Sequence, residues 1–208
     1  WTHFKRNRAA EWSMWFLAII TLLAICAPWV TRFSYEEQNI LHKLQGPTLE
    51  HWMGTDTLGR DLYSRIIYGA RMSLAVGFVT ALFALFVGTL TGSIAGYTGG
   101  WIDKLLMRVV DIFYIFPSLL SSILLGLLLG RGFTGIFLAL GITAWVTQAR
   151  LVRGLVLQAR EFNYVEAARA LGVSHPWIVF RHILPNLWGP IIVSLTMQIP
   201  AAIMSESF

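Results

Sequence analysis

Long, uninterrupted runs of apolar residues dominate this chain. Five of them approach or exceed the roughly 20 residues that a helix needs to cross a bilayer. They cover residues 12–30, 72–95, 109–130, 133–149 and 187–205. The runs are continuous rather than alternating, and a spanning segment must satisfy its own backbone groups, so helices are favoured over strands. The pattern predicts an all-α, polytopic transmembrane helical bundle.

Composition agrees with this class. The chain is 56% hydrophobic and 13% charged, whereas soluble domains carry about 25% charged residues. The single cysteine, Cys26, lies inside the first apolar run, so no disulfide can form within the chain. The five histidines are dispersed without ligand spacing, and we expect no metal site. The net charge of +5 reflects arginines and lysines that flank apolar runs, so we expect no nucleic-acid partner.

The distribution of arginine and lysine predicts a cytoplasmic N-terminus. With that orientation, ten of these residues fall on the cytoplasmic side and six on the outside. The polar loop 150–186 is then cytoplasmic. Five spans leave the end of the chain outside, and the sequence stops directly after the last run, at Glu206-Ser207-Phe208. We therefore expect a sixth helix in the natural protein.

A polar segment, 31–71, separates the first run from the others. Leu58, Leu62, Ile66 and Ala70 recur every four residues, which predicts an amphipathic helix over 58–71 that lies at the outer interface and leads into the second span. We divide the chain into residues 1–71, with the cytoplasmic N-terminus, the first span and this external segment, and residues 72–208, the helical core that contains loop 150–186.

Three acidic or basic residues of the external segment are candidates for contacts with another molecule: Asp56, Arg60 and Asp61. They could equally hold the predicted helix in place. Asp56 or Thr57 would be its N-cap, and Asp61 with Arg65 would form an ion pair one turn apart.

Small and polar residues inside the runs suggest packing and path-lining roles. Gly88, Gly92 and Gly96 recur every four residues, a spacing that lets a neighbouring helix approach closely. Asp111 is expected to pair with Arg108 near the cytoplasmic interface. Candidates for lining a translocation path lie in the third run: Pro117, Ser118, Ser121 and Ser122.

The stretch 160–187 is polar and basic, yet patterned as folded structure. Glu166-Ala-Ala-Arg-Ala-Leu favours a helix, and Gly172 stands where a left-handed residue would end it. Ser174 would begin a second short helix, and Pro185 would break the chain before the last span. The two alanines, Ala167 and Ala168, are predicted to form a thin face suited to docking on another protein, with Glu166 placed to pair with a basic residue there.

The order Glu166-Ala167-Ala168, three residues, Gly172, ten residues, Ile183-Leu184-Pro185 resembles the EAA loop in membrane subunits of ATP-binding-cassette importers. The segment from Gly54 to Leu74 is similar to the one preceding the second span in the C-type permease subunit of dipeptide, oligopeptide and nickel importers. Shorter matches extend this resemblance from about residue 7 to residue 208.

The resemblance implies a type I importer fold in a bacterial or archaeal cytoplasmic membrane. It implies a heterodimer with a homologous permease, one or two cytoplasmic ATPases and an external binding protein. Residues expected to couple to the ATPase are Tyr164, Glu166, Ala167, Ala168, Leu171, Gly172 and Ser174. The external contact candidates Asp56, Arg60 and Asp61 would meet the binding protein. The expected cargo is short peptides, with a nickel chelate or another solute as the alternative.

The sequence holds no Gly-x-x-x-x-Gly-Lys-Ser/Thr phosphate loop, because none of its three lysines follows a glycine. ATP and Mg²⁺ are therefore expected in partner subunits, with no catalytic residue or cofactor in this chain. Two other classes fit less well. An intramembrane hydrolase would need paired catalytic groups at membrane depth, and an ion-coupled carrier would need inverted repeats and several intramembrane charges.

Overall fold

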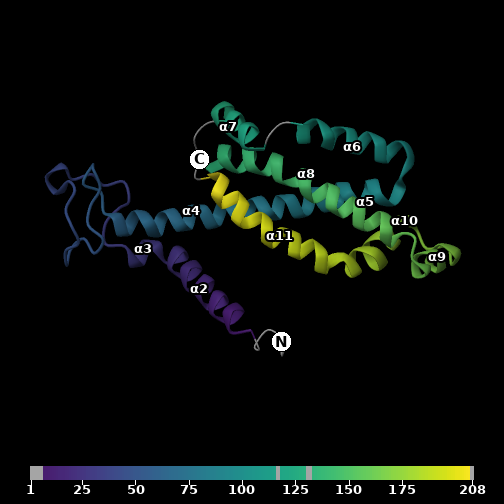
Figure 1. The fold of residues 1–208 in the computed structure, drawn as a ribbon, viewed down its shortest axis with the longest axis horizontal. Helices are drawn as coiled ribbons and strands as arrows, with labels where there is room; N and C mark the ends of the chain where they lie inside the picture. The colour runs from purple at the N-terminus through teal and green to yellow at the C-terminus, as the bar shows by residue number, and fades with distance from the viewer. Residues whose placement is uncertain (1–6, 116–117, 130–132, 207–208) are drawn as a thin grey trace. The chain divides into compact units, whose positions relative to one another are not determined.

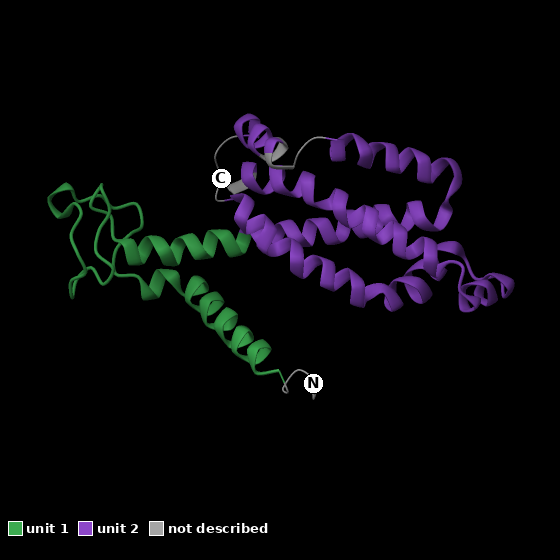
Figure 2. Cartoon of the chain, viewed as in Figure 1, with its two compact units in different colours: residues 1–75 green, residues 76–208 purple. Residues whose placement is uncertain are grey.

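The computed structural model describes residues 7–115, 118–129 and 133–206 (Figure 1). These residues are almost all helical or in turns and contain no strand, only an isolated bridge between Thr55 and Asp61. The predicted all-α class is confirmed. The chain forms two compact units, residues 1–75 and 76–208 (Figure 2).

The first unit begins with α2 (Arg8–Ile25), followed by the short helix α3 (Ala27–Val30). The predicted run 12–30 is thus two helices rather than one. Pro28 has no N–H to donate to the carbonyl one turn earlier, so the α2 hydrogen-bond pattern cannot continue through it. The N–H of Cys26 instead closes α2 by donating to Leu22 and Ala24, and Pro28 is accommodated in the first turn of α3.

An irregular segment follows, with one 3₁₀ turn, η1 (Ile40–His42), before α4 (Leu62–Phe83). The helix predicted over 58–71 begins only at Leu62 and is continuous with the spanning helix, so the prediction is wrong for residues 58–61 and for a helix distinct from the span. Residues 58–61 lie in a turn in which Gly59 has a φ of 72°. From Leu62 the backbone stays helical to Thr98, through the π-helical turn η2 (Ala84–Gly88) and α5 (Thr89–Thr98). The periodicity at 58–70 therefore belongs largely to the start of a spanning helix.

The second unit continues through α6 (Gly100–Ile115), α7 (Ser118–Leu129) and α8 (Phe133–Ala159). The predicted span 109–130 corresponds to the end of α6 and to α7, with residues 116–117 outside the described part of the chain. Within the described ranges, four helical runs are long and apolar enough to cross a membrane. These runs are Arg8–Ile25, Leu62–Thr98, Gly135–Ala159 and His175–Glu206.

The chain ends in α9 (Asn163–Ala170), α10 (His175–Trp177), the π-helical turn η3 (Ile178–Ile183) and α11 (Leu184–Glu206). Pro185 does not break the chain, so that prediction is wrong. A π-helical turn, which is wider than an α-helical turn, comes just before Pro185. It shifts the backbone carbonyls that the proline ring would otherwise crowd. The side-chain amide of Asn186 donates to the carbonyl of His182 at 2.7 Å.

Helix α8 is central to the second unit, where it packs against α5, α6, α7 and α11 (Figure 1). The predicted close approach at the glycine row is confirmed, and the partner is α8 itself. A Cβ on Gly92 would lie 2.4 Å from the carbonyl oxygen of Ala149, and one on Gly96 would lie 2.8 Å from that of Arg153. Only glycine allows α5 and α8 to pack at this distance.

Candidate functional site

The helix–turn–helix at 163–183 is the most definite feature outside the apolar helices. Helix α9 ends where the sequence predicts, at Gly172, which has a φ of 75°. The N–H of Val173 donates to Ala168 and that of Gly172 to Arg169, the paired bonds of a Schellman cap. Ser174 then occupies the N-cap position of α10 without a side-chain hydrogen bond. The direction of the turn between α9 and α10 is therefore determined by the backbone hydrogen bonds of the cap and by the positive φ of Gly172.

Helix α9 presents different residues to the core and to solvent. Val165 and Ala168 are buried, whereas Glu166, Ala167 and Leu171 are exposed, Leu171 to 83%. The predicted face formed by both alanines is wrong, because adjacent helical positions lie about 100° apart and Ala168 turns inward. Of the seven predicted coupling residues, the other six are exposed: Tyr164, Glu166, Ala167, Leu171, Gly172 and Ser174.

The buried face of α9 joins the main core of the second unit. Val165 and Ala168 belong to one cluster with Val152 and Val156 of α8. The same cluster includes seven buried residues of η3 and α11: Ile178, Val179, Ile183, Leu184, Leu187, Ile191 and Leu195. Ile178 and Ile183 are fully buried in it. The exposed residues of α9 are consequently attached to two long helices through a continuous apolar core.

Polar contacts brace the same loop against the end of α5. The hydroxyl of Tyr97 shares a hydrogen bond of 3.0 Å with Nδ1 of His175. The guanidinium of Arg169 lies 5.2 Å from the centre of the Tyr97 ring and donates to its hydroxyl through Nε at 3.4 Å. Tyr97 therefore links α9 and α10 to a helix that precedes them by more than 60 residues. Sequence reasoning missed this contact because the three residues share no local pattern.

Two ion pairs connect α6 to α8. Arg153 donates to both carboxylate oxygens of Asp103, at 2.5 and 2.6 Å, and this contact holds the pKa of Asp103 below its ordinary value. Asp111 pairs with Arg150 of α8, not with Arg108 as predicted. The guanidinium of Arg150 also lies 3.7 Å from the centre of the Tyr114 ring. The helix spacing of Arg108 and Asp111 suggested a local pair, but tertiary packing supplies a different arginine.

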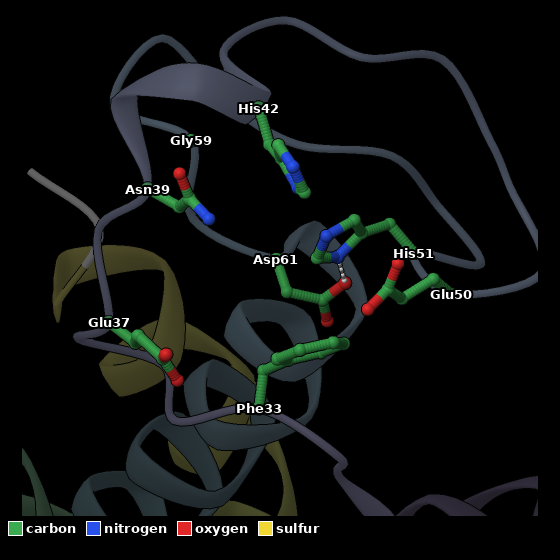
Figure 3. Close-up of a pocket in the computed structure, with 8 residues that line it drawn as sticks. All are labelled: Phe33, Glu37, Asn39, His42, Glu50, His51, Gly59 and Asp61. Atoms are coloured by element: carbon green, nitrogen blue, oxygen red, sulfur yellow. Dashed lines mark hydrogen bonds and ion pairs between the residues drawn. The ribbon is translucent and has the colours of Figure 1, made fainter.

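The irregular segment 31–61 is held by two aspartates. Asp61, not Asp56 or Thr57, caps α4, because its Oδ2 accepts from the N–H of Ser64 at 2.7 Å. Its Oδ1 contacts Nδ1 of His51 at 2.9 Å, and both side chains are almost fully buried beside a cavity of about 60 Å³ (Figure 3). Burial opposes ionisation of Asp61, but hydrogen bonds from Ser64 and His51 outweigh it and lower its pKa.

Asp56 accepts from four donors. They are the N–H groups of Leu58 and Arg60, the Nε of Arg60 at 2.8 Å and the Nη1 of Arg65 at 2.5 Å. Desolvation raises the pKa of Asp56, yet these contacts prevail and lower it to about 2. The predicted Asp61–Arg65 ion pair is therefore wrong, since Arg65 reaches Asp56. Both aspartates have structural partners, and their contact with a binding protein stays a prediction.

The side chains of all four predicted path-lining residues lie outside what the structure describes. Pro117 lies outside the described residues, and so do the side chains of Ser118, Ser121 and Ser122, although these serines belong to α7. The structure shows instead a polar cluster that sequence reasoning missed. Gln148 of α8 is fully buried, and its Oε1 accepts from Ser194 at 3.1 Å and from Gln198 at 2.8 Å. A glutamine in an apolar run was the available signal.

This fold and loop define a class: a multi-pass helical membrane protein with a folded polar loop anchored in its transmembrane core. Comparison with known families makes the class specific. A model described as binding-protein-dependent transport system inner membrane component matches residues 88–208, more than half of the chain. A second, the N-terminal transmembrane domain of oligopeptide transport permease C, matches residues 1–47. The chain belongs to the family of binding-protein-dependent transport system inner membrane components.

Individual relatives agree along nearly the whole chain. It is 41% identical to the oligopeptide transport system permease protein OppC of Bacillus subtilis, over 99% of this chain and 67% of the relative. It is also 41% identical to the dipeptide transport system permease protein DppC of B. subtilis, over 100% of this chain and 65% of that protein. The glutathione transport system permease protein GsiD of Escherichia coli O6:K15:H31 is 38% identical, over 100% of this chain and 69% of GsiD. The chain thus spans about two thirds of the length of these relatives.

Proposed function

We propose that this chain is a permease subunit of an ATP-driven importer and that α9 is its docking point for a cytoplasmic ATPase. The supporting observation is the division of α9 between an exposed face, with Glu166 and Leu171, and a buried face that enters the core of α8 and α11. Leu171, at the C-terminal end of α9, is 83% exposed and offers a protein partner an apolar contact there.

We place the ATPase in another chain, because residues 1–208 contain no phosphate loop. The partner would act on this subunit only through contacts that differ between its ATP-bound and free states. An exposed face fixed to a packed core is suited to receive such contacts, since close-packed interiors transmit displacement rather than absorb it. A homologous permease would complete the translocation path, and an external binding protein would deliver cargo on the side of residues 31–61.

Short peptides are the proposed cargo. The relatives are named for oligopeptide, dipeptide and glutathione transport. These solutes share amide-linked amino acids, which makes a peptide the simplest common substrate. On the outer side, all three candidates have partners within the chain, but 26% of the Arg60 side chain is exposed against 11% for Asp56 and 4% for Asp61. Arg60 is therefore the candidate most accessible to a binding protein.

Charge reversal at Glu166 tests the docking proposal. In the assembled transporter, Glu166→Arg would bring an arginine against the basic partner residue expected to pair with Glu166. It should lower ATP hydrolysis stimulated by the binding protein about 10-fold or more, since like charges at an interface cost several kcal/mol. Glu161→Arg is the matched control, because Glu161 is exposed in the same loop but lies before α9. It should stay within about twofold, since exposed ion pairs contribute little.

A second variant tests the geometry of the cap. Gly172→Trp places a bulky residue at a φ of 75°, where non-glycine residues are strained, and should also weaken ATPase coupling. Absence of any co-purifying ATPase, or equal activity for the Glu166 and Glu161 variants, would refute the proposed docking role.

A further inference from the structure

A cavity of about 150 Å³ lies among α4, α8 and α11 of the second unit. Its polar lining consists of Thr80, Thr143, Thr147, Gln198 and Ser205, and its other lining residues are alanines and one leucine. None of the described residues that line it carries an ionisable side chain. The cavity is therefore polar but uncharged, within helical runs long and apolar enough to span a membrane.

Two of the lining side chains have a buried polar atom without a hydrogen-bond partner. Thr80 is 1% exposed, and its hydroxyl has no hydrogen-bond partner. The Oε1 of Gln198 is also buried and unpaired. Buried polar groups in proteins nearly always have a partner, because leaving one unpaired costs free energy. A molecule that enters the cavity could supply the missing contacts.

The remaining capacity of the cavity is mainly to accept hydrogen bonds. Thr143 donates its hydroxyl to the carbonyl of Leu140 at 2.9 Å, and Ser205 donates to that of Ala201 at 2.8 Å. The amide nitrogen of Gln198 donates to Gln148 and to Ser194. These donors are occupied, whereas the Thr80 hydroxyl can still donate and oxygen lone pairs remain on several side chains. A complementary guest therefore brings mainly N–H or O–H groups, with room for one acceptor opposite Thr80.

The guest that fits is uncharged. A cation in this environment would need a carboxylate to offset its desolvation, and none lines the cavity. A peptide amide carries an N–H donor without a net charge. The cavity therefore suits the backbone of a peptide rather than its charged ends.

We propose that this cavity is a transient binding site on the translocation path, in which Thr80 and Gln198 accept hydrogen bonds from the backbone amides of a peptide that is being transported. This inference rests on the proposed function as a peptide permease. It goes beyond it by assigning cargo contacts to particular residues and by specifying which part of the cargo they meet.

The test uses the complete transporter in proteoliposomes, with tri-alanine delivered by the binding protein, and measures peptide taken up per ATP hydrolysed. Thr80→Val and Gln198→Met remove the polar groups with little change in size. Each should lower this ratio about 3- to 10-fold, the usual effect of one hydrogen bond, while stimulated ATP hydrolysis continues. Thr80→Ser, which keeps the hydroxyl, should restore the ratio.

Thr196→Val is the matched control, because Thr196 is exposed on α11 and its hydroxyl donates to the carbonyl of Val193 in the same helix. It should leave the ratio unchanged. The thermal stability of Thr80→Val should equal or exceed that of the unsubstituted protein, since an unpaired buried hydroxyl is removed.

An unchanged ratio in both cavity variants would overturn the inference and indicate a site that holds only water. A loss of stability together with equal loss of uptake and ATP hydrolysis would overturn it in favour of a structural role. If the unsubstituted protein shows no ATP-dependent peptide uptake, the proposed function itself fails. The two failures are thus separated by the unsubstituted transporter.

Discussion

At the scale of single residues, the irregular segment 31–61 depends on carboxylates that accept from unusually many donors. Asp56 joins a turn, through Leu58 and Arg60, to the first turns of α4, through Arg65. Gly59 is required beside it, because a Cβ there would lie 1.8 Å from the carbonyl oxygen of Asn39. The segment is held by a few polar contacts rather than by an apolar core.

A pH dependence follows from Asp56. Its folded pKa of about 2 lies below the ordinary 3.8, so it stabilises the segment above pH 3.8, and this contribution is lost as pH falls through about 2. Amide hydrogen exchange over residues 54–62, scaled for intrinsic rate, should show protection at pH 5 that declines across this window. Asp56→Asn should reduce protection at pH 5 and flatten the pH dependence.

Glu50→Gln is the control for that experiment, because Glu50 is an exposed carboxylate of the same segment. It should keep the native pH profile. Full protection of the Asp56→Asn protein at pH 5 would contradict the role given to this carboxylate.

At the scale of elements, the contact between α5 and α8 depends on the absence of side chains at three successive turns. Gly88, Gly92 and Gly96 each lie against the backbone or a Cβ of α8. A helix pair at this separation gains dispersion and weak hydrogen bonds between backbones, which matter in lipid because water no longer drives association. The glycine row therefore determines where α8 crosses α5.

Gly92→Ala should destabilise the protein, because the added methyl would lie within 2.4–2.9 Å of α8 atoms that are backbone or Cβ and cannot move independently. We expect a loss of about 1–3 kcal/mol, the usual range for overpacking, seen as a lower Tm in detergent. Gly154→Ala on α8 is the control, since nothing lies within 4 Å of the new Cβ. It should stabilise by up to about 1 kcal/mol through helix propensity. Shifts of Tm in the same direction for both variants would refute the packing argument.

Features governed by local periodicity or by a backbone requirement could be predicted from the sequence. The apolar runs predicted most of the long helices, the Gly172 stop was placed correctly, and the glycine row was assigned to helix packing. Features that depend on distant residues were missed. Asp61 caps α4 with help from His51, and Asp111 selects Arg150 over its neighbour Arg108. No local pattern distinguishes these partners.

Helix continuity was misjudged at prolines for a related reason. Pro28 ends α2, whereas Pro185 is tolerated after a π-helical turn. The two cases differ in the hydrogen-bond register of the preceding turn, and that register depends on packing. Similarly, the cavity lined by Thr80 and Gln198 combines residues that are more than 100 positions apart and could not be assembled from sequence alone.

At the scale of the whole molecule, the excess of arginine and lysine on one side predicts which loops face the cytoplasm. Labelling in intact cells tests this orientation. In a Cys26→Ala background, which removes the single native cysteine, Leu49→Cys should react with a membrane-impermeant maleimide added outside. Glu161→Cys should react only after permeabilisation. Leu49 is 94% exposed and the Glu161 side chain 72% exposed, and Glu161 lies before the proposed docking helix, so both positions are accessible to the reagent.

The opposite labelling pattern would invert the proposed topology. Reaction of both positions in intact cells would place residues 31–61 and the α9 loop on the same side of the membrane. The proposed topology requires opposite sides, because the chain between them would cross the membrane an odd number of times.

The shared core beneath α9 has a mechanical consequence. Val165 and Ala168 are packed in one cluster with α8 and α11, so α9 cannot tilt alone without opening a void beneath it. A force applied at Glu166 is divided between two membrane helices at the ends that lie next to α9. The rigidity of this packed cluster, more than the affinity of docking, would then limit how much of a partner's movement is transmitted to the membrane-spanning parts of α8 and α11. A smaller side chain at Ile178 would leave a void, make the cluster more deformable and reduce the transmitted movement even with docking intact.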